Sequence, residues 1–211
     1  MSIKYFKYLL YFVVLNTISI AKAGSFDDFF IALRNDDVQV VRRLLDLGFE
    51  LNAADAHGQP GLSVAIRAES PKVVKVLLER PGIDVNALNA AGESPLMLAA
   101  IQGDLVDVKL LIGHGARVNQ PGWSALHYAA ASPHTDVLKF LIEQGADVQA
   151  RSPNGTTPLM MAAQYGSEDV IDLLLAHGAD AQARNDLDLG VVDFAKLSGR
   201  RPVVEHLQKL H

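Results

Sequence analysis

The 211-residue chain is 49% hydrophobic and has 24 acidic against 19 basic residues, a formal net charge of −5. Its length and apolar content suffice for one sizeable domain. The acidic balance argues against nucleic acid or anionic lipid as a partner, because both attract positive charge, and favours neutral or basic partners. With no cysteine, the chain has no disulfide staples and must be stabilised by packing.

Residues 1–23 are predicted to be a cleavable export signal. Two lysines give a positive start, an apolar run extends from Leu9 to Ile20, and small residues precede the expected cut after Ala23. The run is shorter than the roughly 20 residues of a membrane-spanning helix, so an uncleaved anchor is the less favoured alternative. We therefore expect a mature chain of residues 24–211, more acidic than the precursor. The bacterial periplasm is its expected location, and full secretion is the alternative.

Two series of residues recur along the rest of the chain. A leucine or its equivalent returns every 30 to 34 residues, and a glycine precedes it by four positions, except that Asp188 stands there in the last case. Only a structural repeat explains both series, since each unit is too small to bury its apolar surface alone. The apolar series is Leu62, Leu96, Leu126, Leu159 and Val192, and the glycine series is Gly58, Gly92, Gly122 and Gly155.

Six units are predicted, each a pair of helices. The first has phenylalanines where interior units have smaller residues and is expected to be an N-terminal cap, and the last is expected to be a C-terminal cap with a polar outer side. Residues 24–211 would then form one complete array. The units cover about residues 26–54, 55–88, 89–120, 121–151, 152–184 and 185–211, and the last is expected to expose Arg200, Arg201, Glu205 and Lys209.

The interior units differ in how their helices start and end. In the second unit Pro60 replaces the threonine that would cap the first helix, which costs about 1 kcal/mol. The fourth unit is three residues short just before Trp123, so its hairpin must be truncated. In the fifth, Thr157 is expected to cap a first helix that ends at a left-handed Gly166, and the second, almost entirely apolar helix is expected to end at Gly178.

Three sequence segments resemble a known family. GESPLMLAAIQGD, GWSALHYAAASPH and GTTPLMMAAQYGS, each followed by leucines and by GARVN, GADVQ or GADAQ, resemble ankyrin repeats, and the similarity covers nearly the whole chain after the leader. The resemblance implies an all-α repeat solenoid of about six units, in which antiparallel helix pairs stack in a curved row and are joined by projecting β-hairpins. It also implies a protein-binding module rather than an enzyme.

Residue types that often carry catalysis have structural explanations here. His114 and His177 occupy equivalent positions near the ends of second helices, and the family pattern implies that His127 bridges loops by hydrogen bonds. The acidic pairs Asp27-Asp28 and Asp36-Asp37 suit turns and helix starts, because adjacent residues point in different directions. We therefore expect no catalytic residues, no cofactor and no metal site.

The resemblance also implies a binding surface. Ankyrin repeats contact partners through hairpin tips and the exposed side of the first helix, which line the concave face. Trp123 and Tyr165 are expected to be aromatic anchors and to form an apolar patch with Ile101. Alternatively, Trp123 fills the volume of the shortened hairpin, and Tyr165 is an ordinary helix-end residue. Carried over by register, the candidate partner-binding residues are Arg67, Glu93, Ile101, Gln102, Trp123, Asn154, Gln164 and Tyr165.

The favoured function is a monomeric, non-enzymatic periplasmic protein that binds a partner protein, with neither nucleic acid nor a membrane anchor involved. Similarity to exported bacterial ankyrin proteins implies two roles: protection against peroxide through a catalase, and immunity by neutralising a toxin delivered to the periplasm. The sequence leaves open which protein is bound. An enzyme with a hidden site and a purely structural spacer are the two other classes considered.

Overall fold

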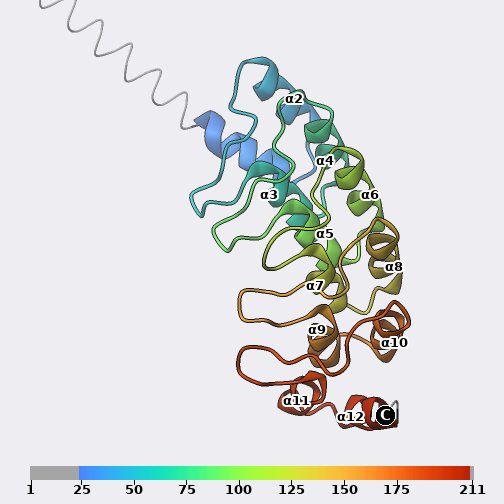
Figure 1. The fold of residues 1–211 in the computed structure, drawn as a ribbon. Coiled ribbons are helices and arrows are strands. Elements are labelled where there is room, and N and C mark those ends of the chain that lie inside the picture. The colour runs from blue at the N-terminus through green and yellow to red at the C-terminus, as the bar shows by residue number, and fades with distance from the viewer. Residues whose placement is uncertain (1–23, 210–211) are drawn as a thin grey trace, which may run out of the picture. The chain divides into compact units, whose positions relative to one another are not determined.

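The structure, a computed structural model, describes residues 24–209, and in this range helices alternate with loops (Figure 1). Contacts divide the chain into two compact units, Met1–Ile83 and Asp84–His211. The export signal predicted at residues 1–23 lies outside the described residues. Within residues 24–209, no helix combines the length and the apolar character that crossing a bilayer requires.

Unit 1 and unit 2 here denote these two compact parts of the chain, and each contains more than one of the predicted repeats. Unit 1 contains two helix pairs. Residues 24–34 are helical and are followed by α2, and the second pair is α3 and α4. Helix α4 packs against both α2 and α3. The core of the unit is apolar, with Phe29, Leu33 and Leu77 fully buried. The helix bounds are α2 Val38–Asp46, α3 Gly61–Arg67 and α4 Pro71–Leu78.

The start of each helix in unit 1 follows its local sequence. Asp37 caps α2, since its carboxylate accepts from the N–H groups of Gln39 and Val40. Asp36 has a left-handed φ of 53°, and its Oδ1 accepts from the N–H of Val73 at 2.8 Å. The predicted turn and helix-start roles of this acidic pair are confirmed. Helix α3 lacks a side-chain cap, as its proline at the cap position predicts.

Unit 2 contains four helix pairs in the described residues. The first helices of the pairs, α5, α7, α9 and α11, pack side by side in chain order, and each also packs against the second helix of its own pair. The second helices α6, α8 and α10 form a parallel layer in the same order (Figure 1). The bounds are α5 Pro95–Gln102, α6 Leu105–Gly113, α7 Ala125–Ala130, α8 Thr135–Glu143, α9 Pro158–Tyr165, α10 Glu168–Ala176, α11 Val191–Leu197 and α12 Arg201–Lys209.

Helix α9 begins as predicted and ends differently. Thr157 caps it, since its hydroxyl accepts from the N–H of Met160, and Pro158 is the first helical residue. The prediction of a left-handed Gly166 is wrong, because this residue has an extended conformation with φ −76° and ψ −175°. Glycine is needed there for a different reason: a Cβ would stand 2.4 Å from the carbonyl oxygen of Ala130 in the neighbouring layer.

Within the described residues, the turns that precede α3, α5, α7, α9 and α11 share a left-handed residue at the same position. Each glycine that precedes a repeat leucine by four positions has a positive φ, between 70° and 82°. Asp188 takes the same conformation, with φ 58°. The substitution predicted from the spacing is therefore confirmed. The β-hairpins implied by the resemblance are reduced in the described residues to single bridges, Ala54 with Pro60 and Arg184 with Gly190.

Consecutive repeats of unit 2 are joined by side-chain amides. Asn86 donates to the carbonyl of Gly115 and accepts from the N–H of Arg117, and Gln149 makes the equivalent pair of bonds two exits further on. Such amides close the carbonyl end of a second helix and hold the next exit segment, so each one ties two repeats together.

The hydrogen bonds of Asn119 show which part of the fourth repeat is shortened. Counted back from the repeat leucine, Asn119 corresponds to Asn89, whose Oδ1 accepts two N–H groups within its own hairpin. Asn119 instead donates to Gly145 and accepts from the N–H of Asp147, so it acts as a joining amide. The three missing residues are therefore those that would have formed the hairpin, and the link between the repeats is preserved.

The last helix pair is less exposed than its predicted role as a cap implies. Arg200 is half-buried, and its guanidinium donates to the carbonyls of Ala162, Ala163 and Gly166 at 3.0, 2.9 and 2.5 Å. The prediction that Arg200 is exposed is wrong, because its guanidinium reaches back to three carbonyls at the end of α9. Arg201, Glu205 and Lys209 are exposed as predicted.

Candidate protein-binding surface

The structure separates the predicted binding residues into groups. Arg67 ends α3 in unit 1, where it is exposed, and the other seven belong to unit 2. Glu93, Trp123 and Asn154 precede their first helices and lie at the hairpin end. The remaining four end first helices: Ile101 and Gln102 close α5, and Gln164 and Tyr165 close α9.

The hairpin-end residues are largely engaged in the fold. Glu93 accepts from the amide of Asn89 at 2.7 Å and from the hydroxyl of Tyr128 at 3.1 Å. Asn154 is exposed, but its Oδ1 accepts from the Ser152 hydroxyl at 2.5 Å, and its carbonyl accepts from the N–H of Asp186 at 3.0 Å. Hydrogen bonds already made within the fold leave these groups less capacity to bind a partner.

Trp123 packs edge-on against a buried histidine. Its ring lies 5.2 Å from the ring of His127, with an interplanar angle of 75°, and the side chain is half-buried. This geometry is favourable for two aromatic rings and excludes water from His127. The contact supports the alternative in which Trp123 covers the site of the shortened hairpin.

The predicted patch of Trp123, Ile101 and Tyr165 is not compact. Trp123 stands before α7, whereas the other two stand in the last turns of their helices, at the opposite end of the same helical layer. Ile101 and Tyr165 are themselves two layers apart, about 20 Å at roughly 10 Å per packed layer. Between them α7 contributes only the half-buried Ala131 and the buried Ser132.

A closer apolar neighbour for Tyr165 lies at the end of α11, the first helix of the next pair. Leu197, at the end of α11, is 67% exposed, Tyr165 is 58% exposed, and α9 packs directly against α11. We define the helix-end surface as Ile101, Gln102, Gln164, Tyr165 and Leu197. Leu197 is not among the residues predicted from the sequence. Its spacing could have identified it, since it follows Val192 by the same five residues that separate Gln164 from Leu159.

The helix-end surface rests on a fixed backbone. Arg200 holds three carbonyls in the last turn of α9 and just after it, so the backbone that bears Tyr165 is bonded to the neighbouring repeat. Gly166 packs against the carbonyl of Ala130 on the other side. An exposed aromatic side chain on a fixed backbone loses little conformational entropy when it binds, which suits an interface anchor.

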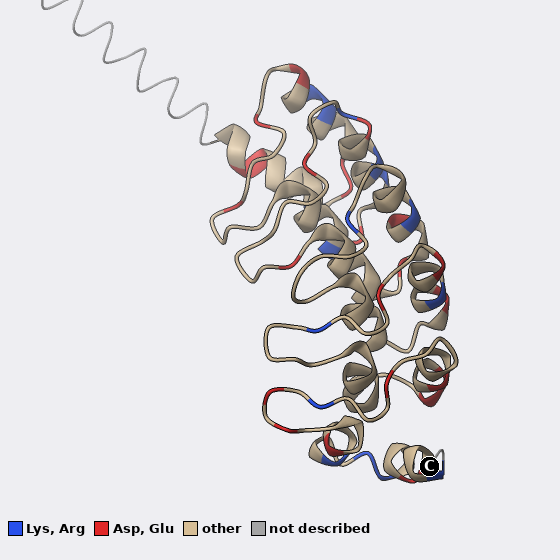
Figure 2. Ribbon diagram, in the orientation of Figure 1, with Lys and Arg blue, Asp and Glu red and all other residues tan. Residues whose placement is uncertain are grey.

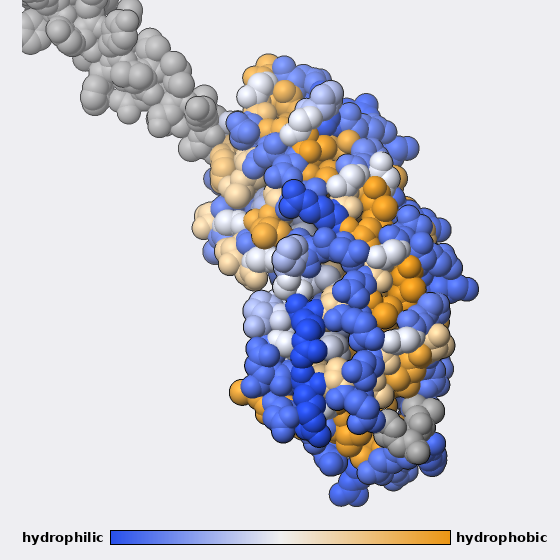
Figure 3. Space-filling model, viewed as in Figure 1, coloured by the Kyte–Doolittle hydropathy of each residue, from blue (hydrophilic) through white to orange (hydrophobic). Residues whose placement is uncertain are grey.

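Charge distinguishes the two helical layers in the first three helix pairs of unit 2, whereas α11 of the first layer carries Asp193 and Lys196. Helices α5, α7 and α9 contain no Lys, Arg, Asp or Glu, whereas α6, α8 and α10 each carry charged residues (Figure 2). The second helices also show apolar surface (Figure 3). This surface consists of large apolar residues that are half-buried at equivalent positions of each second helix, so the regular packing of the repeats accounts for them. They are Leu110, Ile112, Phe140, Ile142, Leu173 and Leu175.

The helix-end positions vary from layer to layer. At the two positions that end a first helix stand Ile101 and Gln102 in one layer, then a small pair, then Gln164 and Tyr165. Ile101 and Tyr165 are exposed, so packing does not constrain these two side chains to one type, whereas the buried Ser132 is constrained. Variation at exposed positions of an otherwise regular array is what a surface adapted to a particular partner requires.

The histidines have structural roles. Nδ1 of His114 and of His177 each donates to the carbonyl four residues earlier, at 2.8 Å, which closes the ends of α6 and α10 as predicted. His127 is fully buried: its Nε2 donates to the carbonyl of Thr156 at 3.0 Å, and its Nδ1 accepts from Ser124. Burial lowers the pKa of His127, so the ring is neutral and bridges two repeats.

One buried acid has no counterpart in the other repeats. Asp107 of α6 is 3% exposed, and within residues 24–209 its Oδ1 has no hydrogen-bond partner. Burial, followed by the charge of Asp104, raises the pKa of Asp107 to about 6. The equivalent residues of α8 and α10 are Val137 and Val170, both fully buried. The carboxyl therefore occupies a site built for an apolar side chain.

The described residues contain no cluster of three or more His, Cys, Asp or Glu side chains that could hold a metal ion. Two titratable groups of unit 2 with shifted pKa values, Asp107 and His127, lie in different helices and are buried in the packing of the repeats. The arrangement offers surfaces for contact with another macromolecule.

Comparison with known proteins agrees with the repeat architecture. A family model described as ankyrin repeats in three copies matches residues 96–185, and one described as ankyrin repeats in many copies matches residues 62–112. Together the two matches run through more than half of the sequence. The chain belongs to the ankyrin-repeat family, whose repeats mediate protein–protein interaction.

Three curated relatives illustrate the similarity. Rat ankyrin repeat and SAM domain-containing protein 6 is 36% identical over 103 residues, 47% of this chain and 12% of the relative. Human neurogenic locus notch homolog protein 1 is 33% identical over 138 residues, 63% and 5% of the two chains. The mouse B-cell lymphoma 3 protein homolog is 36% identical over 117 residues, 54% and 26%. The chain thus spans only a small part of each relative.

Proposed function

We propose that this protein is a non-enzymatic binding module of the bacterial periplasm that captures a partner protein through the helix-end surface of unit 2. The observation that supports this most is the pair Tyr165 and Leu197, two large apolar side chains exposed on adjacent layers. Large side chains at the centre of an interface supply much of its binding energy when water is excluded around them.

The partner is expected to offer an apolar contact with a neutral or basic surround. The helices α5, α7 and α9 are uncharged, whereas α11 carries Asp193 and Lys196 beside Leu197, so the apolar contact has charged groups at its α11 side. The whole chain is acidic, so long-range attraction favours a partner of opposite charge. The protein itself is expected to act as a monomer, which sedimentation velocity of the purified chain would test.

Affinity capture tests the proposal directly. The tagged full chain would be expressed in its own host, and proteins retained from a periplasmic extract would be compared for wild type and for Tyr165→Ser/Leu197→Ser. Val106→Ser is the matched control, since Val106 is 65% exposed but lies on α6. The double variant should lose the partner, and the control should keep it. Equal recovery from all three would refute a role for the helix-end surface.

The identity of the captured protein separates the two proposed roles. A catalase, together with peroxide sensitivity of a deletion strain, would support protection against oxidative stress. A toxin, with self-intoxication of the deletion strain, would support immunity. Failure to retain any protein would favour a structural spacer and contradict the proposal. The proposed location is tested separately, because N-terminal sequencing of the periplasmic protein should begin at Gly24.

A further inference from the structure

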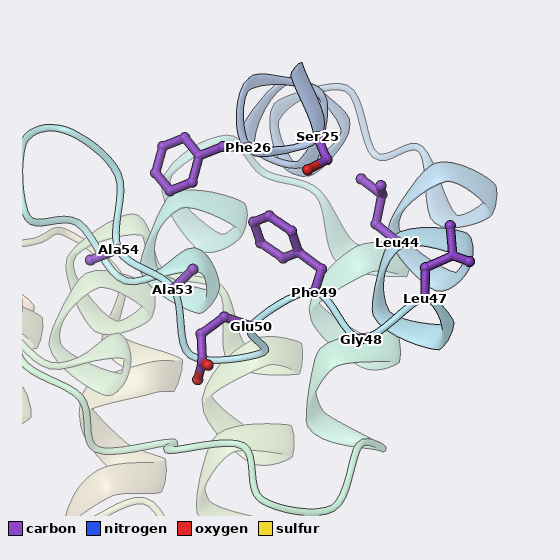
Figure 4. Close-up of a pocket in the computed structure, with 9 residues that line it drawn as sticks. All are labelled: Ser25, Phe26, Leu44, Leu47, Gly48, Phe49, Glu50, Ala53 and Ala54. Atoms are coloured by element: carbon purple, nitrogen blue, oxygen red, sulfur yellow. The ribbon is translucent and has the colours of Figure 1, made fainter. Parts of the chain in front are cut away.

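The first helix pair of unit 1 contains a pocket of about 860 Å³. Residues of the helical segment 24–34, of the end of α2 and of the exit segment that follows α2 surround it (Figure 4). Pockets of this volume are typical of sites that receive a ligand. Its nine lining residues are Ser25, Phe26, Leu44, Leu47, Gly48, Phe49, Glu50, Ala53 and Ala54.

The walls of this pocket, called here the cap pocket, are apolar and supported from behind. Phe49 stands between Phe26 on one side and Leu44 and Leu47 on the other (Figure 4). The ring of Phe49 lies 6.3 Å from that of Phe26 and 4.4 Å from that of the fully buried Phe29. The aromatic wall is thus tied to the core of unit 1 and presents a preformed surface.

The cap pocket is open and has large apolar side chains at its mouth. Leu47 is 78% exposed, the most exposed of the large apolar residues in the described part of the chain, and Phe26 and Phe49 are only half-buried. An isolated exposed leucine is ordinary, but one at the mouth of a concave aromatic site marks a place where an apolar group binds.

The chemistry of the lining restricts what can occupy the pocket. Glu50 is the only charged residue among the nine, and its carboxylate points away from the ring of Phe49 (Figure 4). The Glu50 side chain has no hydrogen bond or ion pair with the rest of residues 24–209. An occupant with an apolar group for the aromatic wall and a cation for Glu50 would complement both features.

The size of the site argues against a second copy of the chain. Nine residues line the pocket, whereas a stable protein–protein interface takes roughly 20–30 residues from each side. A single bulky side chain with its neighbours along a peptide needs much less surface. A segment that places a phenylalanine or leucine beside a lysine or arginine offers one group to the apolar wall and the other to Glu50.

We propose that the cap pocket binds a short basic-apolar peptide segment of a partner protein, whose bulky apolar side chain lies against Phe26, Phe49 and Leu47 while an adjacent lysine or arginine faces Glu50. This site belongs to unit 1 and is separate from the helix-end surface, so either can fail without the other.

Selection from a displayed library of random seven-residue peptides on the full-length wild-type chain would test the proposal. Enriched peptides should pair Phe, Leu or Trp with Lys or Arg. Fluorescence polarisation of a labelled enriched peptide should show binding weakened by about tenfold or more in Leu47→Ser. Glu50→Lys should weaken it comparably and favour peptides with Asp or Glu in place of the cation. Val106→Ser should leave the affinity unchanged within about twofold.

Three results would overturn the proposal. Peptides that bind all the variants equally would place the contact elsewhere. Enrichment of no basic-apolar sequence, together with tight binding of the neutral probe N-phenyl-1-naphthylamine that is lost in Leu47→Ser, would show a small-molecule pocket. A wild-type dimer in sedimentation velocity that Leu47→Ser makes monomeric would show that a second copy fills the site. Since Leu47 is largely exposed, the variants should keep the wild-type circular dichroism spectrum.

Discussion

Replacing Asp107 by asparagine should stabilise the protein, and only when the carboxyl would be charged. The pKa of Asp107 is raised from 3.8 to about 6 in the folded protein, mainly because the group is buried. A raised folded pKa means that the folded state binds the proton more tightly than the unfolded state does. The contribution of Asp107 to stability is therefore fully present below pH 3.8 and is lost as the pH rises through about 6.

The size of the effect follows from the shift. At 1.36 kcal/mol for each pKa unit, a shift of about two units amounts to about 3 kcal/mol of lost stability when the carboxyl is fully charged, near pH 7.5. Asparagine keeps the shape of aspartate but cannot ionise, so Asp107→Asn should recover most of this amount. The corresponding residues of α8 and α10 are valines, so Asp107→Val should gain still more from apolar burial.

Urea unfolding of the full chain, followed by circular dichroism over a range of pH, is the assay. The stability difference between Asp107→Asn and wild type should be small near pH 4 and should grow to about 3 kcal/mol near pH 7.5. A difference that does not change with pH, or a variant that is less stable than wild type at neutral pH, would refute the reasoning. The latter result would mean that the buried carboxylate has a stabilising partner.

Three further substitutions test the packing of the repeats, each by urea unfolding. Asn119→Ala removes both hydrogen bonds that join two repeats, so it should cost about 1–2 kcal/mol, and an unchanged midpoint would show that the link is dispensable. Asp188→Gly should gain about 1 kcal/mol because Asp188 is left-handed, and a loss would contradict the strain argument. Ser63→Ala should gain about 1 kcal/mol, since the buried hydroxyl has no partner in the described residues, and destabilisation would reveal one.

The periodic part of the fold was predictable from the sequence because each repeat places similar residue types at the same positions. The spacing alone identified Asp188 as the residue that takes the glycine position, and its φ of 58° confirms this. Thr157 and Pro158 likewise marked the start of α9. Local chemistry fixes such features, since a cap or a left-handed turn depends on a few neighbouring residues.

Features that depend on the neighbouring repeat were not predictable in this way. Gly166 has the sequence context of a left-handed helix end, but the close carbonyl of Ala130 is what requires a glycine. Arg200 is of the residue type expected in a solvent-facing cap, but its guanidinium donates to carbonyls at the end of α9. Both errors arise because a single repeat does not show which groups of the neighbouring repeat will face it.

The candidate surface was predicted by position more reliably than by residue type. Family register pointed to the ends of the first helices, where Ile101 and Tyr165 are indeed exposed. The preference for a tryptophan as anchor drew attention to Trp123, whose contact with His127 lies at the other end of the helical layer. Which residues lie next to each other across layers depends on stacking, and that is how Leu197 became the neighbour of Tyr165.

Hydrogen exchange of the full chain, with and without its captured partner, tests the proposed binding surface most directly. The proposal predicts that binding slows exchange at the ends of α9 and α11, in the segments 164–167 and 197–200, and leaves α6, α8 and α10 unchanged. Slowing confined to the second helices would contradict it and would assign binding to the apolar surface of that layer instead.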